Sequence, residues 1–310
     1  MDSATLTRTI FIDGEAGTTG LGIAQRLAAL RGVSIKSIAP EHRKDAAARL
    51  DMMASVDLVV LCLPDDAAKE SVALADTLGT RSPKIVDAST AFRVAPDWTY
   101  GFPEMTAGHA AAVQAAKRVS NPGCYPTGGI ALLRPLVEAG LLPGDFPLSV
   151  NAVSGYSGGG KSMIAAYEEK SAPDFELYGL GLQHKHVPEL QKYSKLAARP
   201  IFVPSVGNFR QGMLVSVPLH LDALPGKPKA ADLHAALEKH YAGSKLVSVQ
   251  PAEANGKLEP QALNNSDRLE LRVFANETHR QAVLVARLDN LGKGASGAAV
   301  QNIQLMLGLE

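Results

Sequence analysis

The segment SNPGCYPTGG (residues 120–129) contains one of only two cysteines in the 310-residue chain. Two prolines and three glycines surround Cys124, which is a poor setting for a packed core residue. Cys124 lies between a predicted strand ending near Asn121 and a helical pattern over residues 127–140. A helix N-terminus stabilises a thiolate through its dipole and its free N–H groups. The spacing therefore favours a nucleophile at Cys124 over an inert thiol, whereas Cys62, in the apolar run VVLCLP, is expected to be inert.

A nucleophilic cysteine needs an acid or a base close to it in space. Most of the eight histidines stand alone, but GLQHKHVPEL places His184 and His186 two residues apart. Side chains two apart on an extended segment point the same way, and the Pro-Glu pair that follows can begin a helix. The pattern favours an imidazole pair that acts with Cys124. The alternative is a solvated basic loop.

A glycine-rich turn, DGEAGTTGLG, follows the strand predicted over residues 8–13. Gly14, Gly17 and Gly20 let backbone N–H groups approach a pyrophosphate at the start of a helix. The first gap is one residue longer than in G-x-G-x-x-G, which changes the shape of the site. The context favours dinucleotide binding over a plain tight turn.

The end of the second predicted strand bears on the choice of dinucleotide. An acidic residue there binds the ribose hydroxyl of NAD, and basic residues favour the 2′-phosphate of NADP. The segment SIAPEHRK offers Glu41 but also Arg43 and Lys44. It favours NADP, and the alternative for the two basic residues is a solvated helix start.

Three further loops have side chains or backbone groups suited to anions. In DASTAFRVAPDW, Ser89, Thr90 and Arg93 follow a predicted strand, and an arginine can clamp a phosphate or carboxylate. The alternative for Arg93 is a surface position. VSGYSGGGKS (153–162) and DNLGKGASG (289–297) offer backbone N–H groups to phosphate, amide or nicotinamide, unless they are plain flexible loops.

Two different patterns position these residues. The first third alternates continuous apolar runs with helical patterns, which predicts a parallel sheet covered by helices on both faces. Its predicted strands are 8–13, 33–39, 56–64 and 84–89, and its predicted helices are 21–30, closed by Gly32, then 43–54 and 67–79. After about residue 145, alternation in 146–155, 201–221 and 268–290 predicts a mostly antiparallel sheet. Helices are expected at 229–243 and 296–309.

The composition excludes several classes of protein. Hydrophobic residues make up 46% and charged residues 20% of a chain long enough for two domains. The formal net charge of zero leaves no basic field for nucleic acid or an anionic membrane. Two cysteines make no disulfide framework, so a cytoplasmic location is expected. No metal-type Cys/His spacing, signal-peptide pattern or membrane-length apolar run is present.

The motifs GEAGTTG, DASTAFR, SNPGCYPTG, VSGYSGGGK, HKHVPE and DNLGKGASGAAVQN occur in this order along nearly the whole chain. Together they resemble the short type of the N-acetyl-γ-glutamyl-phosphate reductase family. The cysteine and double-histidine motifs are specific to this family. The cofactor turn and the DNLGKGA motif are shared more widely, including with aspartate-semialdehyde dehydrogenase. Lys185 departs from the arginine more usual between the histidines, and lysine cannot form a bidentate fork.

The resemblance implies an α/β fold with two domains. Residues 1–121 would form a Rossmann domain that binds NADPH. Residues 122–289 would form an α+β, glyceraldehyde-3-phosphate-dehydrogenase-like domain for catalysis and oligomerisation. Residues 290–310 would return as a helix to the Rossmann domain. A homodimer or homotetramer, formed through the second sheet, is expected.

The resemblance also implies an activity, the NADPH-dependent reduction of N-acetyl-γ-glutamyl phosphate in arginine biosynthesis (EC 1.2.1.38). Cys124 would form a thioester and His184 would act as acid and base. Arg93, His186, Ser89 and Ser154 would bind the substrate, and no metal is expected. The residues implied for cofactor binding are Gly14, Gly17, Thr18, Thr19, Gly20, Arg43, Pro64, Gly158, Asn290 and Gly292. The alternatives are aspartate-semialdehyde dehydrogenase, an α-aminoadipate-type analogue, and a non-catalytic NADP-binding redox sensor.

Overall fold

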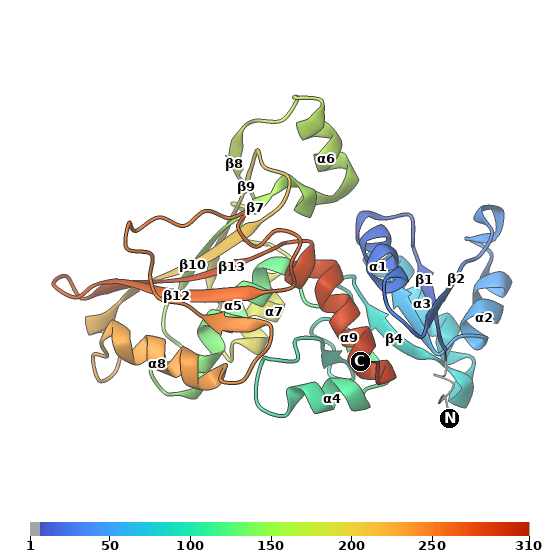
Figure 1. Cartoon of the computed structure of the whole chain (residues 1–310), viewed down its shortest axis with the longest axis horizontal. Coiled ribbons are helices and arrows are strands. Elements are labelled where there is room, and N and C mark those ends of the chain that lie inside the picture. Colours follow the sequence, from blue (N-terminus) through green and yellow to red (C-terminus); the bar gives the residue numbers. More distant parts are fainter. Residues whose placement is uncertain (1–6, 310) are drawn as a thin grey trace. The chain divides into compact units, whose positions relative to one another are not determined.

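The computed structural model describes residues 7–309 (Figure 1). Residues 1–6, on which part of the signal-peptide prediction rests, lie outside this range. The chain divides into two compact units. One contains the described residues up to 103, then 108–122 and the segment from 295 onward, and the other contains 104–107 and 123–294. Within residues 7–309, no helix is both long enough and apolar enough to cross a membrane.

The first unit is built on a six-stranded sheet with the order β2-β1-β3-β4-β6-β5. All neighbouring strands are parallel, as predicted from the alternation of strands and helices. The strands are β1 (Arg8–Asp13), β2 (Val33–Lys36), β3 (Leu58–Leu61), β4 (Lys84–Asp87), β5 (Thr99–Tyr100) and β6 (Arg118–Ser120). Parallel pairing places the carboxyl ends of these strands along one edge of the sheet.

Helices cover both faces of this sheet because its strands are apolar on both sides. The helices are α1 (Thr18–Ala28), α2 (Ala46–Ala54), α3 (Asp65–Asp76), α4 (His109–Ala115) and α9 (Gly297–Leu307). On β1, Ile10 and Ile12 belong to a core that includes Ile303 of α9. Phe11, which points to the other face, packs in a second core with Met53 of α2. The C-terminal helix α9 contacts α1, α4 and β4 within this unit.

Several predicted boundaries in this unit differ from the structure by a few residues, and two of these differences concern residues singled out in the sequence. Helix α1 begins at Thr18 instead of residue 21 and ends at Ala28, with Ala29 as the C-cap residue. Gly32 therefore does not close the helix but supplies a positive φ of 74° in the turn before β2. Strand β3 ends at Leu61, so Cys62 follows the strand instead of lying inside it.

The second unit contains a seven-stranded sheet with the order β11-β12-β13-β10-β7-β9-β8. Its strands are β7 (Ser149–Gly155), β8 (Phe175–Leu177), β9 (Ile201–Gly207), β10 (Met213–His220), β11 (Val247–Val249), β12 (Leu269–Asn276) and β13 (Gln281–Leu288). The pairs β7–β9 and β11–β12 are parallel, and the other neighbouring pairs are antiparallel. The prediction of a mostly antiparallel sheet is confirmed.

The two longest predicted strands each divide in two. Residues 268–290 form the hairpin of β12 and β13, in which Asn276 pairs with Gln281 and Arg280 takes a positive φ of 52° in the turn. Residues 201–221 form β9 and β10, which lie on either side of β7. Alternation alone does not reveal these turns, because polar residues also occupy every second position of a half-buried strand.

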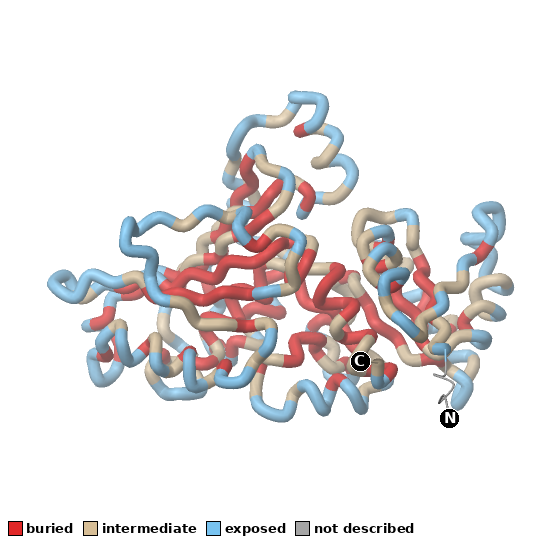
Figure 2. Tube along the Cα trace, viewed as in Figure 1, coloured by how far each residue is buried: buried red, intermediate tan, exposed pale blue. Residues whose placement is uncertain are grey.

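The helices of this unit are α5 (Cys124–Glu138), α6 (Gly160–Glu168), α7 (Val187–Tyr193) and α8 (Ala230–His240). Helix α5 packs closely on one face of the sheet, where a Cβ atom on Gly128 would lie 2.9 Å from Val215 and 3.2 Å from Ala286. Figure 2 shows that buried residues concentrate along the central strands of each sheet. A rigid sheet therefore supports the helix that begins at Cys124.

Candidate active site

Cys124 is the first residue of α5, and Gly123 is its N-cap residue. The backbone N–H and the Oγ1 hydroxyl of Thr127 both donate to the carbonyl oxygen of Gly123, at 3.0 and 2.9 Å. The helix thus begins three residues earlier than predicted, and the cysteine lies within its first turn. This turn contains no acidic residue, so no side chain of the turn itself offsets the positive end of the 15-residue helix at the thiol.

Glu189, in the first turn of α7, holds this helix start in place. Glu189 is only 1% exposed, and its Oε2 accepts a hydrogen bond of 3.0 Å from the backbone N–H of Gly123. The N–H of Gly123 is therefore used within the protein and is not available to a ligand. No sequence pattern indicated this role, although Glu189 is the last residue of the HKHVPE motif.

His184 and His186 lie together, as predicted, but not on an extended segment. His186 has φ −84° and ψ −12° and is the N-cap residue of α7, whose first turn contains Pro188. The two imidazole rings lie 4.7 Å apart between centroids. The ring of Tyr125 lies 6.2 Å from that of His184 and 5.8 Å from that of His186. Because Tyr125 follows Cys124, a tight turn brings both imidazoles to the start of α5.

A backbone contact determines the tautomer of His184. The backbone N–H of His186 lies 3.2 Å from Nδ1 of His184, and an N–H group can only donate. Nδ1 is therefore the acceptor, and the neutral ring carries its proton on Nε2. Nε2 is then a hydrogen-bond donor, suited to a thiolate or to a developing oxyanion.

Two buried tyrosines border the same region. The hydroxyl of Tyr178 donates to that of Tyr125 at 3.1 Å, which in turn donates to the carbonyl oxygen of Ser205 at 3.0 Å. Burial raises the pKa of both phenols, that of Tyr178 to about 12, and the nearby Cys124 adds to both effects. Both side chains are consequently neutral hydroxyl groups at neutral pH. No sequence pattern pointed to Tyr178.

The DNLGKG segment closes against the cysteine. A Cβ atom on Gly294 would lie 2.9 Å from Cβ of Cys124 and 3.0 Å from the carbonyl oxygen of Asp289, so only glycine fits without a shift. Next to it, Lys293 is 1% exposed, and its Nζ donates to both carboxylate oxygens of Glu104 at 2.8 and 2.9 Å. This buried ion pair ties the segment to the same unit.

The other predicted residues of this unit separate into two groups. Ser154 is 3% exposed and donates to the carbonyl oxygen of Gly155 at 3.0 Å. A Cβ atom on Gly158 would lie 3.1 Å from Oγ of Ser154 and 3.6 Å from Nδ2 of Asn290, so these three residues cluster. Gly292 lies against the backbone of Ser266 instead, where an added Cβ atom would be 2.1 Å from the carbonyl oxygen of Ser266.

In the first unit, the glycine-rich turn has the shape that a pyrophosphate requires. Gly14 has φ +89°, and a Cβ atom there would lie 2.3 Å from the carbonyl oxygen of Cys62. A Cβ atom on Gly20 would lie 2.6 Å from the carbonyl oxygen of Gly14. Thr18 and Thr19 begin α1, and its N-cap residue, Gly17, provides no side-chain cap. The turn therefore leaves backbone N–H groups for an anionic ligand and fits a dinucleotide.

A cavity of about 200 Å³ lies beside this turn. Its lining comes from β1, from the glycine-rich turn and from the segment after β2, and it includes Gly14, Glu15, Ile38, Arg43 and Lys44. Pro64 is the N-cap residue of α3 and follows β3 in the chain. Glu41, the acidic alternative, lies exposed in a short 3₁₀ helix, Pro40–His42.

The DASTAFR loop of the first unit is organised by Asp87. Oγ of Ser89 donates to Oδ2 of Asp87 at 2.7 Å and accepts the backbone N–H of Ala91 at 3.1 Å, so both functions of this hydroxyl serve the loop. Burial raises the pKa of Asp87 to about 6, against the effects of Ser89 and Arg93. Arg93 itself is 8% exposed, so it is not the surface arginine that was its alternative.

The two cysteines should differ strongly in reactivity. Burial, with Asp87 and Asp13 nearby, raises the pKa of the Cys62 thiol to about 12, so it stays protonated until the pH approaches that value. Because only the thiolate is alkylated, iodoacetamide at pH 7.5 should label Cys124 at least about 100 times faster than Cys62. Peptide mapping after timed labelling measures both rates, with Cys124→Ser as the control. Equal rates at the two sites would contradict the assignment.

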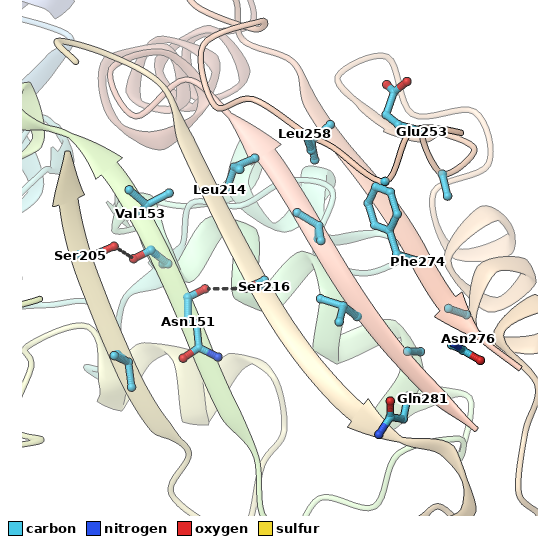
Figure 3. Close-up of a pocket in the computed structure, with 18 of the residues that line it drawn as sticks. Asn151, Val153, Ser205, Leu214, Ser216, Glu253, Leu258, Phe274, Asn276 and Gln281 are labelled. Atoms are coloured by element: carbon cyan, nitrogen blue, oxygen red, sulfur yellow. Dashed lines mark hydrogen bonds between the residues drawn. The ribbon is translucent and has the colours of Figure 1, made fainter. Parts of the chain in front are cut away.

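A second, larger hollow of about 1000 Å³ lies on the face of the seven-stranded sheet opposite α5 (Figure 3). Neither Cys124 nor the two histidines line it. Leu214, Ser216 and Phe274 point into it from β10 and β12, and Val283, also in its lining, is 38% exposed. An apolar, partly exposed sheet face of this extent is typical of an interaction surface.

Comparison with protein families assigns both units. Residues 16–113 match the family described as "Semialdehyde dehydrogenase, NAD binding domain". Residues 124–290 match the family described as "Semialdehyde dehydrogenase, dimerisation domain". The parallel sheet with its glycine-rich turn is thus a nucleotide-binding, Rossmann-like domain, and the mixed sheet belongs to a dimerisation domain.

Solved structures show the same fold at low sequence identity. Aspartate semialdehyde dehydrogenase II from Vibrio cholerae, complexed with ASA, superposes with a TM-score of 0.73 at 16% identity and covers 97% of this chain and 98% of that chain. The enzyme from Francisella tularensis gives a TM-score of 0.71 at 12% identity, with 97% and 100% coverage. At these identities the likeness establishes the fold.

Sequence relatives are much closer. The N-acetyl-gamma-glutamyl-phosphate reductase of a Chelativorans species is 54% identical over 309 residues, covering 97% of this chain and 99% of that protein. The protein of the same name from Brucella suis is 55% identical over 307 residues, covering 96% and 98%. With this identity over nearly its whole length, and with both domain matches, the chain belongs to the N-acetyl-γ-glutamyl-phosphate reductase family of semialdehyde dehydrogenases.

Proposed function

We propose that this chain reduces N-acetyl-γ-glutamyl phosphate to N-acetylglutamate semialdehyde and phosphate, with NADPH as the reductant, in arginine biosynthesis. Relatives with this printed name, at 54–55% identity, support the assignment. The structural observation that carries it is the position of Cys124 as the first residue of α5, where the following residue, Tyr125, packs against an imidazole pair. A nucleophile in this position suits acyl transfer from an activated phosphate.

The reaction begins at the sulfur of Cys124. The thiolate, favoured by the helix N-terminus, attacks the acyl carbon, and phosphate leaves from a tetrahedral intermediate to give a thioester. The thiolate is regenerated when the semialdehyde departs, so each turnover starts from the anion. Glu189 fixes the position of the first residues of α5 for this attack, because it accepts a hydrogen bond from the N–H of Gly123.

His184 stabilises the charges that develop during these steps. Its Nε2–H donates a hydrogen bond to the oxyanion of the tetrahedral intermediate and to the phosphate as it leaves. The backbone N–H of His186 at Nδ1 favours the neutral ring, so donation is preferred over removal of a proton from the thiol. Gly123 does not contribute an N–H to the oxyanion, because Glu189 accepts it.

The substrate carries a carboxylate and a phosphate, which require cations and polar donors. We assign Arg93 and His186 to these anionic groups, and Ser154 to the polar part of the substrate, since all three are buried side chains with polar ends. Ser89 instead stabilises the loop that contains Arg93, because its hydroxyl is engaged by Asp87 and Ala91.

The glycine-rich turn provides the site for the pyrophosphate of the cofactor. Bound NADPH supplies the hydride that reduces the thioester. Backbone N–H groups at Thr18 and Thr19 would hold the pyrophosphate, and Arg43 would hold the ribose 2′-phosphate. Gly17, whose own N–H donates to the carbonyl oxygen of Gly14 at 3.0 Å, would shape the turn. Gly158 and Asn290, which cluster with Ser154, are assigned to the nicotinamide end.

We further infer that two copies of the chain associate through the hollowed face of the seven-stranded sheet. The dimerisation-domain match covers this sheet, and the face exposes apolar side chains such as Val283. A homodimer, or a homotetramer built from two such dimers, would cover it. Sedimentation equilibrium at micromolar concentration measures the mass, and a particle of 32.6 kDa would contradict the inference.

An assay in the oxidative direction tests the proposed reaction. With phosphate and NADP⁺, the protein should oxidise N-acetylglutamate semialdehyde at least about 100 times more efficiently than aspartate semialdehyde, measured as NADPH absorbance. A preference for aspartate semialdehyde, or for an α-aminoadipate-type analogue, would replace the substrate assignment. Cofactor binding without any turnover would favour the non-catalytic redox sensor.

A further inference from the structure

Glu15, the second residue of the GEAGTTG turn, holds a position that nothing in the pyrophosphate site requires. Oε1 accepts a hydrogen bond of 2.6 Å from Nη2 of Arg43, and Oε2 accepts one of 2.8 Å from Oγ of Ser37. The side chain of Glu15 is 24% exposed and that of Arg43 is 43% exposed. The turn after β1 is thereby joined to the segment after β2 by a short ion pair at the surface.

This ion pair borders the 200 Å³ cavity, because Glu15, Arg43 and Lys44 all contribute to its lining. Strands β1 and β2 pair in parallel, so their carboxyl ends place these residues side by side. In a nucleotide-binding unit of this kind, the end of the second strand contacts the adenosine ribose, where NADP carries a phosphate and NAD a hydroxyl group. Glu15 therefore occupies the position at which the two cofactors differ.

A carboxylate here opposes a phosphate in two ways. It engages the Arg43 guanidinium that a 2′-phosphate would need, and it places a negative charge beside the dianion. A buried carboxylate near the turn, that of Asp13, has its own partners. Oδ2 of Asp13 accepts from Nη2 of Arg49 at 2.6 Å and from Ser71 at 2.8 Å, so it does not compete for Arg43.

We propose that Glu15 is an internal competitor for the ribose 2′-phosphate, which masks Arg43 and thereby limits the preference of this chain for NADP over NAD. The proposal deepens the cofactor assignment made above and rests on it. When a 2′-phosphate binds, Arg43 exchanges the carboxylate for the phosphate. A ligand with a free 2′-hydroxyl group leaves the ion pair intact.

Replacement of Glu15 by glutamine tests this exchange, because the amide retains hydrogen-bonding atoms and loses the charge. Isothermal titration with adenosine 2′,5′-bisphosphate should show about two- to fivefold tighter binding for Glu15→Gln, as expected for a partly exposed ion pair. The affinity for AMP should stay unchanged. Glu70→Gln, a neutral replacement of an exposed carboxylate on α3 that does not line the cavity, is the matched control and should alter neither affinity.

A double-mutant cycle separates masking of Arg43 from simple repulsion. Arg43→Gln should weaken binding of the bisphosphate, and in that background Glu15→Gln should give no further gain. A gain that persists without Arg43 would overturn the proposal, as would equal gains for both ligands, no gain, or a loss. The gain should also shrink in 0.5 M salt, where the Debye length falls to a few ångströms.

Two controls keep the result interpretable. Glu15→Ala removes the carboxylate altogether and should shift the bisphosphate affinity in the same direction, and thermal unfolding checks that each variant is folded. Equal affinities of the unmodified protein for the bisphosphate and AMP would contradict the NADP assignment. The role of Glu15 is judged separately, from whether its replacement improves binding of the bisphosphate alone.

Discussion

Cys124→Ser should lower turnover of N-acetyl-γ-glutamyl phosphate by at least about 10⁴-fold, the scale seen when a covalent nucleophile is removed. Serine has nearly the same size, so the start of α5 and its contact with Gly294 should be retained. Its hydroxyl, however, is not ionised at neutral pH, and the helix N-terminus cannot make it a thiolate equivalent. Stopped-flow measurement of NADPH consumption gives the rate.

The matched control for this experiment is Cys62→Ser. Cys62 is not part of the second unit and its thiol stays protonated because burial raises its pKa to about 12. Its replacement should leave the rate within about twofold. If Cys124→Ser retained near-normal phosphate-dependent oxidation of the semialdehyde, the thioester mechanism would be wrong. Acid quenching of the unmodified protein, with substrate and without NADPH, should also trap one acyl group per Cys124.

The second large effect is expected at His184. His184→Ala should lower the rate by about 10²- to 10³-fold, the usual cost of removing one hydrogen-bond donor to a developing oxyanion. His184→Gln presents an amide N–H close to the position of Nε2–H, so it should recover a substantial part of this loss if His184 acts chiefly as a donor. Single-turnover kinetics measure the acylation and reduction steps for both variants.

Comparison of these two variants tests the tautomer deduced from the His186 N–H contact. Equal losses for alanine and glutamine would mean that proton transfer, and not donation of a hydrogen bond, is the essential role. A control is His234→Gln, since His234 lies on α8 and pairs with Glu238. The control should change neither step.

Much of this site could be predicted because its parts are local. The glycine spacing after β1 and the proline-glycine bend before Cys124 are properties of short segments, and backbone sterics alone limit which residues fit there. The boundaries shifted by about one helical turn, as for α1 and α5, because helix ends depend on caps that the periodicity does not contain. The imidazole pair was also predicted, but for a reason that the αR conformation of His186 contradicts.

The residues that the sequence analysis missed share a different property. Glu189 reaches Gly123 across 66 positions, and Tyr178 reaches Tyr125 across 53. No spacing rule connects such pairs, since strand order in the seven-stranded sheet decides which segments meet. Arg43 was predicted as a cofactor residue from its charge alone. Its carboxylate partner Glu15 lies 28 positions away, and the pairing of β1 with β2 brings the two together.

The sequence by itself determined the class of chemistry: a dinucleotide turn, a thiol at the start of a helix and two adjacent imidazoles. These follow from residue type and from spacings within one turn or one strand end, where local geometry leaves few options. Only the tertiary structure decided how the groups are used. It placed a buried carboxylate on the N–H of Gly123, a backbone donor on Nδ1 of His184 and a competing anion on Arg43. The contacts at Gly123 and Arg43 join segments far apart in the chain, which meet because the strands beside them are packed into sheets, and the contact at His184 depends on the αR conformation of His186.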